Sequence, residues 1–358
     1  MRRTVLVAGV LSGSLIFGQS VNAATVTNPI RIANWSGGSY SKENSKQFDH
    51  CGASATNAGG IAISYSVNRE YRWRLTFSNP AWNFTSGLSL NLVLAMGERD
   101  HMRGRAVAVE KQALEVVVED NISLFARLAM GGQMKVTAGG LAFEFQLADS
   151  DEVLTALAQC VMRSTGIAQN TKSKRPGAQR AAQPAPVADA AADDEAKALA
   201  ADLVGYAGIT GARMSSPGEG SAELRVAVVW KAGLVTGTVS VLGPGDAAKV
   251  EEMPDKLIDG EARKCPGGLF FVSELDAIDQ SPVARVFTSC KAPEAITSIY
   301  YLAVPRPNGG VFLLSTMTRG SGFAGAVQRQ AELVDAKVRA IITTSLRRLE
   351  QRGATARP

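Results

Sequence analysis

Few side chains in this chain could carry acid–base or nucleophilic chemistry. The 358 residues include only two histidines, His50 and His101. His50 directly precedes a cysteine, and His101 lies in the charged segment 97–105 (GERDHMRGR), which is typical of a solvated turn. A Ser-His-Asp or Cys-His catalytic arrangement therefore has few possible members. No P-loop, HExxH zinc motif or EF-hand loop is found, and no G-x-G-x-x-G is expected after a strand. No catalytic residue, metal ligand or cofactor is therefore assigned.

Acidic side chains form three clusters that could do carboxylate chemistry. Paired carboxylates can hydrolyse sugar polymers, and spacing in the sequence does not reveal such pairs. Two clusters lie where helices are expected to begin, a place that favours acids because of the helix dipole, and the third lies in an expected hairpin turn. A carboxylate-based hydrolase therefore stays an alternative function. The clusters are Asp149/Asp151/Glu152, Asp193/Asp194/Glu195 and Glu274/Asp276/Asp279.

The four cysteines are expected to form disulfides. There is no C-x-x-C motif, and the only histidine beside a cysteine is His50, so a zinc site is disfavoured. Four cysteines allow three pairings, and a linker between the two expected domains favours pairing within each domain. Cys265 and Cys290 are placed symmetrically about an expected hairpin turn, so two antiparallel strands leaving that turn would bring them within bridging distance. Cys51 would then pair with Cys160.

The N-terminal segment has the pattern of a secretory signal peptide over residues 1–23. Arg2-Arg3 precedes an apolar run from Val5 to Phe17, and the small-residue site Val21-Asn22-Ala23 follows. The run is shorter than the roughly 20 residues that span a bilayer, and no later stretch reaches that length. The mature protein is expected to be exported, most simply to the periplasm and alternatively to the outside of the cell. Export disfavours nucleic acid as a partner.

A stretch at 170–192 is expected to link two domains. It is rich in Ala, Pro and Gln and has almost no large apolar residue, so it cannot bury enough surface to offset its ordering entropy. The chain is expected to end in a basic tail at 351–358. Residues 24–169 hold 13 basic and 13 acidic side chains, so the net charge of +5 comes from Arg2 and Arg3 (+2), the stretch 170–188 (+4) and the stretch from Arg347 (+3), against −4 for the rest of the second domain. The linker is either a solvated spacer or a contact for an anionic lipid or polymer surface. Its basic residues are Lys172, Lys174, Arg175 and Arg180.

The fold class expected for the whole chain is α+β. The domain at 25–165 should be a β-rich sandwich or barrel-like unit with two helices, one beginning near Asp120 and one after Ser150. The domain at 193–350 should be an antiparallel sheet flanked by an N-terminal and a C-terminal helix. Strands are expected near 61–67, 71–77, 88–94, 114–118, 141–147, 222–230, 234–242, 269–275, 283–290, 298–304 and 311–318.

The end of the first domain resembles a family of small exported alphaproteobacterial proteins of the invasion-associated locus B type. The likeness lies in the signal peptide, in a cysteine after the first strands, and in a Phe-x-Phe-x-Leu run before an amphipathic helix. The run is Phe143, Phe145 and Leu147, and the helix carries Ala156-Leu157. The resemblance implies a periplasmic or surface-associated protein, linked in some members to host-cell entry. The second domain is similar in outline to Mog1/PsbP-like modules, a likeness of architecture that implies no function.

These observations favour a non-enzymatic exported protein of two disulfide-bonded modules. It would act as a binding factor or in the assembly or maintenance of the cell envelope, with an envelope protein or polymer as its partner. The alternatives are a carboxylate-based hydrolase of envelope polymers and a surface-exposed factor that contacts a host.

Overall fold

The structure is a computed structural model. It describes residues 26–42, 45, 47–97, 101–165, 190–206, 209, 211–215, 226–242, 250–278, 281–306, 309–320 and 325–355. The expected signal peptide lies outside the described residues, and so does the expected linker up to residue 189, with Lys172, Lys174, Arg175 and Arg180.

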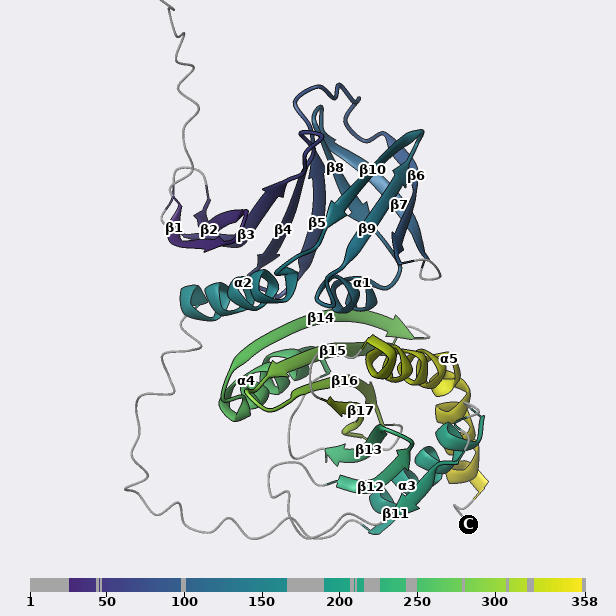
Figure 1. Ribbon diagram of the computed structural model, residues 1–358. Helices are drawn as coiled ribbons and strands as arrows, with labels where there is room; N and C mark the ends of the chain where they lie inside the picture. Colours follow the sequence, from purple (N-terminus) through teal and green to yellow (C-terminus); the bar gives the residue numbers. More distant parts are fainter. Residues whose placement is uncertain are drawn as a thin grey trace, which may run out of the picture.

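The N-terminal part is one antiparallel sheet of ten strands in the order β1-β2-β3-β4-β5-β8-β7-β6-β9-β10. The sheet curls upon itself, because Phe77 of β5 stacks on Phe145 of β10 with ring centroids 5.6 Å apart although the two strands are far apart in that order. Figure 1 shows the resulting barrel-like shape. The strands are β1 (Thr27–Ile32), β2 (Trp35–Ser41), β3 (Phe48–Thr56), β4 (Ala62–Asn68), β5 (Trp73–Ser78), β6 (Ser89–Met96), β7 (His101–Glu110), β8 (Ala113–Val117), β9 (Gln133–Ala138) and β10 (Leu141–Gln146).

Two helices close one end of this curled sheet, α1 (Asn121–Leu128) and α2 (Ser150–Thr165). Asp120 caps α1, since its carboxylate accepts a hydrogen bond from the backbone N–H of Ser123 at 3.0 Å. Helix α2 buries an apolar stripe that includes Val153, Leu157 and Val161, as expected of an amphipathic helix, and lies against β3 through the Cys51–Cys160 disulfide. Both predicted helices are therefore present.

The prediction of a solvated turn at 97–105 is wrong from His101 onward, where β7 begins. In this strand His101, Arg103 and Arg105 are exposed while the intervening residues are half-buried. Arg103 pairs with Val93 in β6. A strand whose outer face is cationic has few apolar residues, so its composition hides the period of two.

The C-terminal part is an antiparallel sheet of seven strands in the order β11-β12-β13-β17-β16-β15-β14, with consecutive strands β14 to β17 forming a meander. The predicted α+β class, with two antiparallel sheets, is confirmed. The strands are β11 (Arg213–Ser215), β12 (Val226–Ala232), β13 (Val235–Leu242), β14 (Gly268–Ile278), β15 (Ser281–Lys291), β16 (Ile296–Pro305) and β17 (Val311–Gly320).

Helices cover both faces of this second sheet. Leu302 and Val304 of β16 belong to the apolar core beneath α3 (Ala190–Tyr206) and α5 (Gly325–Thr355). The alternating residues Tyr301 and Ala303 belong to the core beneath η3 (Val250–Glu252) and α4 (Met253–Lys264), and the Tyr301 hydroxyl donates to Glu261 of α4 at 3.0 Å. Helix α3 begins inside the range expected for the linker, and α5 extends into the range expected for the tail.

Helix α4 was not predicted, because it lies in a polar interval rich in Glu and Asp. Its apolar stripe is narrow, with Met253, Leu257 and Ile258 buried and the opposite side charged. Pro254 at its first turn fits the helix start, where no backbone N–H is required.

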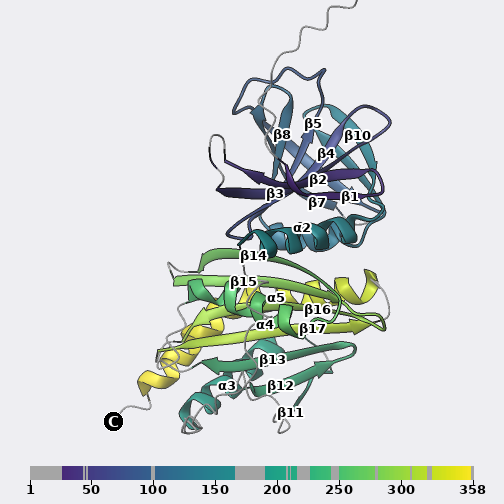
Figure 2. The same ribbon diagram turned by 90° about the vertical axis from the view of Figure 1, so that its left-hand side faces the viewer.

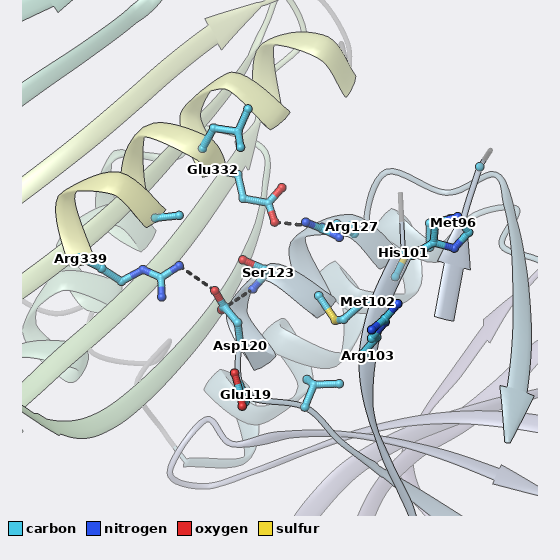
Figure 3. A pocket seen from close by; sticks show the side chains of 14 residues that line it. Met96, His101, Met102, Arg103, Glu119, Asp120, Ser123, Arg127, Glu332 and Arg339 are labelled. Atoms are coloured by element: carbon cyan, nitrogen blue, oxygen red, sulfur yellow. Dashed lines mark hydrogen bonds and ion pairs between the residues drawn. The ribbon is translucent and has the colours of Figure 1, made fainter. Parts of the chain in front are cut away.

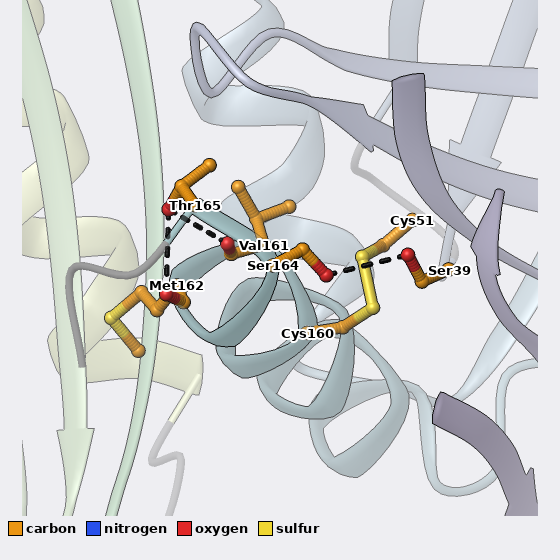
Figure 4. The surroundings of a disulfide bond; sticks show 7 residues. All are labelled: Ser39, Cys51, Cys160, Val161, Met162, Ser164 and Thr165. Carbon is orange, nitrogen blue, oxygen red and sulfur yellow. Dashed lines mark hydrogen bonds between the residues drawn. A yellow bond between two sulfur atoms is a disulfide. The ribbon is translucent and has the colours of Figure 1, made fainter. Parts of the chain in front are cut away.

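Both predicted disulfides are confirmed. Cys51 of β3 and Cys160 of α2 have Cα atoms 6.2 Å apart, and Cys265 and Cys290 have Cα atoms 5.7 Å apart (Figure 4 shows the first bond). Cys290 lies opposite Leu269 in the register of β14 and β15, and Cys265 stands at the end of α4, before β14 begins. The predicted hairpin therefore brings the cysteines together, but only Cys290 belongs to one of its strands. Each bridge closes within one part of the chain.

The two parts pack directly on one another (Figures 1 and 2). Strand β14 is the last strand of its sheet and lies beneath α1 and α2. Tyr71 packs edge-on against Phe271 with centroids 4.8 Å apart, and Trp73 packs against Phe270 at 5.3 Å. A single apolar cluster includes residues of both parts, so the two domains form one packed body. No helix in the described ranges is long and apolar enough to cross a membrane.

Candidate functional site

The joint between the two domains contains a network of charged side chains. Its central cation is Arg285 of β15, which is only 6% exposed. Arg285 donates to Asp120 and to Glu274 of β14, each at 3.0 Å. Arg339 of α5 donates to Asp120 at 2.7 Å and to Asp335 at 2.8 Å. Asp120 thus connects the first domain to a strand and a helix of the second.

Opposing effects act on the carboxyl groups of this network. Burial alone would raise the pKa of Asp120, but Arg285, the backbone N–H of Ser123 and Arg339 together hold it at about 2. Burial raises the pKa of Asp335 and of Glu274 despite their arginine partners, and the charge of Asp120 adds to that rise. The negative charge of the network is therefore held most firmly on Asp120.

A cleft of about 870 Å³ opens on one side of this network; we call it the α1–α5 cleft (Figure 3). One wall comes from β7 and α1 and the other from α5. Arg127 of α1 donates to Glu332 of α5 at 2.9 Å across it. Leu333 is 64% exposed and lines the same cleft. Its other lining residues are Met96, Gly97, His101, Met102, Arg103, Val118, Glu119, Asp120, Ser123, Ala336 and Arg339.

A second cleft, of about 780 Å³, lies on the other side of the junction between β8 and α1; we call it the β5–α4 cleft. Val118 and Glu119 line both clefts and form the partition between them. The remaining lining residues of the β5–α4 cleft are Arg69, Glu70, Arg72, Trp73, Arg74, Glu115, Val116, Val117, Asn121, Glu251, Pro254, Asp255, Ser273, Glu274, Leu275 and Asp276.

The structure separates the two histidines. His50 lies outside both clefts, where its Nδ1 is 2.8 Å from Asp49 and its ring stacks on Tyr40. His101 lines the α1–α5 cleft from the start of β7. Within the described residues, no hydrogen bond joins the imidazole of either histidine to a serine, threonine or cysteine side chain.

The three carboxylate clusters also separate. Asp151 bridges the domains by accepting a hydrogen bond from Lys291 at 2.8 Å. Glu195 of α3 accepts one from Arg306 at 2.6 Å. In the third cluster Glu274 and Asp276 line the β5–α4 cleft, and Asp279 lies outside the described residues. One predicted cluster of three therefore contributes to a cleft.

A glycine-rich run follows β17, so the expectation that no G-x-G-x-x-G stands after a strand is wrong. Residues 320–325 read GSGFAG, the spacing of a dinucleotide-binding fingerprint between a strand and a helix. That fingerprint works within a parallel β-α-β unit. Strand β17 pairs antiparallel with both β13 and β16, and residues 321–324 lie outside the described ranges. The topology therefore does not support a dinucleotide site here.

Among the described residues, no three His, Cys, Asp or Glu side chains are grouped so that they could hold a metal ion. The clefts combine exposed apolar side chains with charged groups from both domains. Ligand sites in proteins occur preferentially in such clefts at domain interfaces. The arrangement is suited to binding.

Comparison with known proteins adds little. No protein-family model matches the chain, and no curated protein matches it. The solved structure "Crystal structure of the di-domain ARO/CYC StfQ from the steffimycin biosynthetic pathway" aligns with 92% of this chain and 90% of that chain at 10% sequence identity, with a TM-score of 0.14. A TM-score this low supports no argument about fold or function.

Replacing Asp120 by asparagine is expected to lower the free energy of unfolding by about 2 kcal/mol at pH 7. The folded-state pKa of Asp120, about 2, lies below its ordinary value of 3.8, so ionised Asp120 stabilises the folded protein. That stabilisation is present above about pH 4 and is lost as the pH falls through about 2. Denaturant unfolding at several pH values measures it. Asparagine can still cap α1, which isolates the loss of charge.

The difference between the D120N variant and the unsubstituted protein should therefore shrink as the pH falls from about 4 to about 2. Asp335 and Glu274 have raised pKa values and act in the opposite direction, but they are present in both proteins. A difference that stays constant over this pH range would show that the effect does not come from the charge of Asp120. Asp194→Asn, on the exposed side of α3, is the control.

Proposed function

We propose that this protein is a non-enzymatic exported protein of the cell envelope that binds another envelope component at the joint between its two domains. The observation that carries the proposal is the pair of disulfides, one in each domain. Structural disulfides form and persist in oxidising compartments such as the periplasm. The N-terminal segment, with its basic start, apolar run and small-residue site, supports export.

The joint supports the binding role. Aromatic contacts and the ion network hold the two domains together, so the clefts beside them exist before any ligand arrives. Pre-formed sites do not spend binding energy on ordering the protein. The α1–α5 cleft offers exposed Leu333 together with Met96 and Met102, and methionine adapts its shape to varied partners.

Export is tested by producing the chain with and without residues 1–23 in a bacterial host, followed by fractionation and alkylation of free thiols. The full chain is expected in the periplasmic fraction with all four cysteines protected. The truncated chain is expected in the cytoplasm with reactive thiols after unfolding. Cytoplasmic retention of the full chain would contradict the proposal.

Binding at the joint is tested with a photo-crosslinking amino acid at position 333 in the exported full chain. Position 234 is the matched control, because Leu234 and Leu333 are both leucines that are 64% exposed, and Leu234 lies in the turn between β12 and β13. A crosslinked envelope component is expected from position 333 and not from position 234. Equal crosslinking from the two positions would contradict a specific site.

A carboxylate-based hydrolase is the second candidate. Asp255, Glu274 and Asp276 line one cleft, and burial raises the pKa of Asp255 and of Glu274, as a general acid requires. The pairing of Glu274 with Arg285 opposes that role because it favours the ionised form. Release of soluble products from envelope glycans, abolished in the E274Q or the D255N variant, would establish the enzyme and overturn the non-enzymatic proposal.

A further inference from the structure

The β5–α4 cleft has a strong excess of negative charge. Seven carboxylates and three guanidinium groups line its volume of about 780 Å³. Arg72 and Arg74 each lie 3.8 Å from a glutamate of the cleft, and Glu274 is paired with Arg285. Four further acids have no ion pair within the described part of the chain: Glu119, Glu251, Asp255 and Asp276.

These four acids come from different elements and surround the cleft. Glu119 follows β8 in the first domain, whereas Glu251, Asp255 and Asp276 belong to η3, α4 and β14 of the second. Carboxylates that are distributed in this way can each meet a separate cation on one extended ligand. The cleft therefore suits a ligand with several positive groups along its length.

The wall of the cleft also offers groups that are not acidic. Leu275 is 58% exposed and Val117 is 37% exposed, although both are large apolar side chains. Exposed apolar side chains beside carboxylates favour a ligand that carries both apolar and cationic groups, which a metal ion or a polyamine does not.

We infer that the β5–α4 cleft binds a basic peptide segment, in which lysine or arginine side chains alternate with apolar ones. The cations meet the distributed carboxylates, and the apolar side chains cover Leu275 and Val117. The inference rests on the proposed binding role of the joint and names the ligand of this one cleft.

The test is titration of the full chain against a fluorescently labelled peptide of alternating lysine and leucine. We expect saturable binding that weakens as the salt concentration rises. The triple variant E119Q/E251Q/D255N should weaken binding by roughly tenfold, since three partly exposed ion pairs together correspond to about that factor. The matched control, E110Q/D194N/E294Q, removes the same charge outside the cleft and should change the affinity less than about twofold.

The variant Leu275→Ser removes the exposed apolar side chain from the wall and keeps every carboxylate. It should weaken peptide binding by roughly two- to tenfold and leave competition by spermidine unchanged. If the two triple variants weaken peptide binding equally, then only the net charge of the protein determines the affinity, and the inference is overturned. Equal affinity for spermidine and the peptide would also overturn it. None of these outcomes affects the tests of export and of crosslinking at position 333, so the proposed function is tested independently of this inference.

Discussion

Replacing both Cys51 and Cys160 by alanine is expected to lower the free energy of unfolding by about 5 kcal/mol. The bond joins positions that are 109 residues apart in the sequence. In the loop-closure model a cross-link stabilises by reducing the entropy of the unfolded chain, and a loop of this length gives the stated figure. Both cysteines are fully buried between β3 and α2. Equilibrium unfolding in denaturant, followed by circular dichroism, measures the difference.

The second disulfide is the internal control for this prediction. Cys265 and Cys290 are 25 residues apart, so the same model gives about 3.5 kcal/mol for their replacement by alanine. Cys51–Cys160 should therefore be the more important bond by about 1 kcal/mol. The reverse order would show that packing around the bonds, and not the length of the closed loops, determines their contributions.

Much of the fold could be predicted because its signals are local. The alternation along β4 places Ile63, Tyr65 and Val67 in the core, and the stripe on α2 does the same with a period near four. The pairing of Cys265 with Cys290 followed from a hairpin whose register depends on one turn. Such features depend only on residues that are close together in the chain, so they can be predicted from the sequence.

Elements with charged outer faces were harder to predict. Strand β7 exposes His101, Arg103 and Arg105, and α4 buries only a narrow stripe that includes Leu257 and Ile258. In both cases the polar side chains outnumber the apolar ones over a short stretch. Composition then indicates a loop, although β7 pairs with both β6 and β8, and residues 253–264 form a helix.

The joint between the domains could not be predicted, because its contacts connect distant residues. Asp120 and Arg339 are 219 positions apart, and Asp120 by itself is an ordinary helix cap. One signal was present in Arg285, which stands among apolar residues in the strand that the sequence predicted near 283–290. A charge in such a place requires a partner, but the sequence does not say which acid supplies it.

Replacing Arg285 by methionine is expected to lower the free energy of unfolding by about 3–5 kcal/mol at pH 7. Methionine roughly preserves the volume of the side chain, so the main change is electrostatic. Asp120, Glu274 and Asp335 all lie within 4 Å of the guanidinium, and Arg339 would be left as the remaining cation that contacts Asp120 and Asp335. Buried carboxylates without a counter-charge are costly, which is why removing one partner of a buried pair costs more than the pair contributes.

Lys291→Met is the matched control, because Lys291 lies on the same strand and also bridges the two domains. Its partner is Asp151 at 2.8 Å, but the lysine side chain is 50% exposed, so its loss should cost less than about 1 kcal/mol. The deficit of the R285M variant should also shrink in acid, because the carboxyl groups left without a partner have raised pKa values and take up protons in the folded protein. A deficit that is the same at pH 4 and pH 7 would mean that Arg285 stabilises the joint by packing. An equal deficit for Lys291→Met would mean that burial does not distinguish the two bridges.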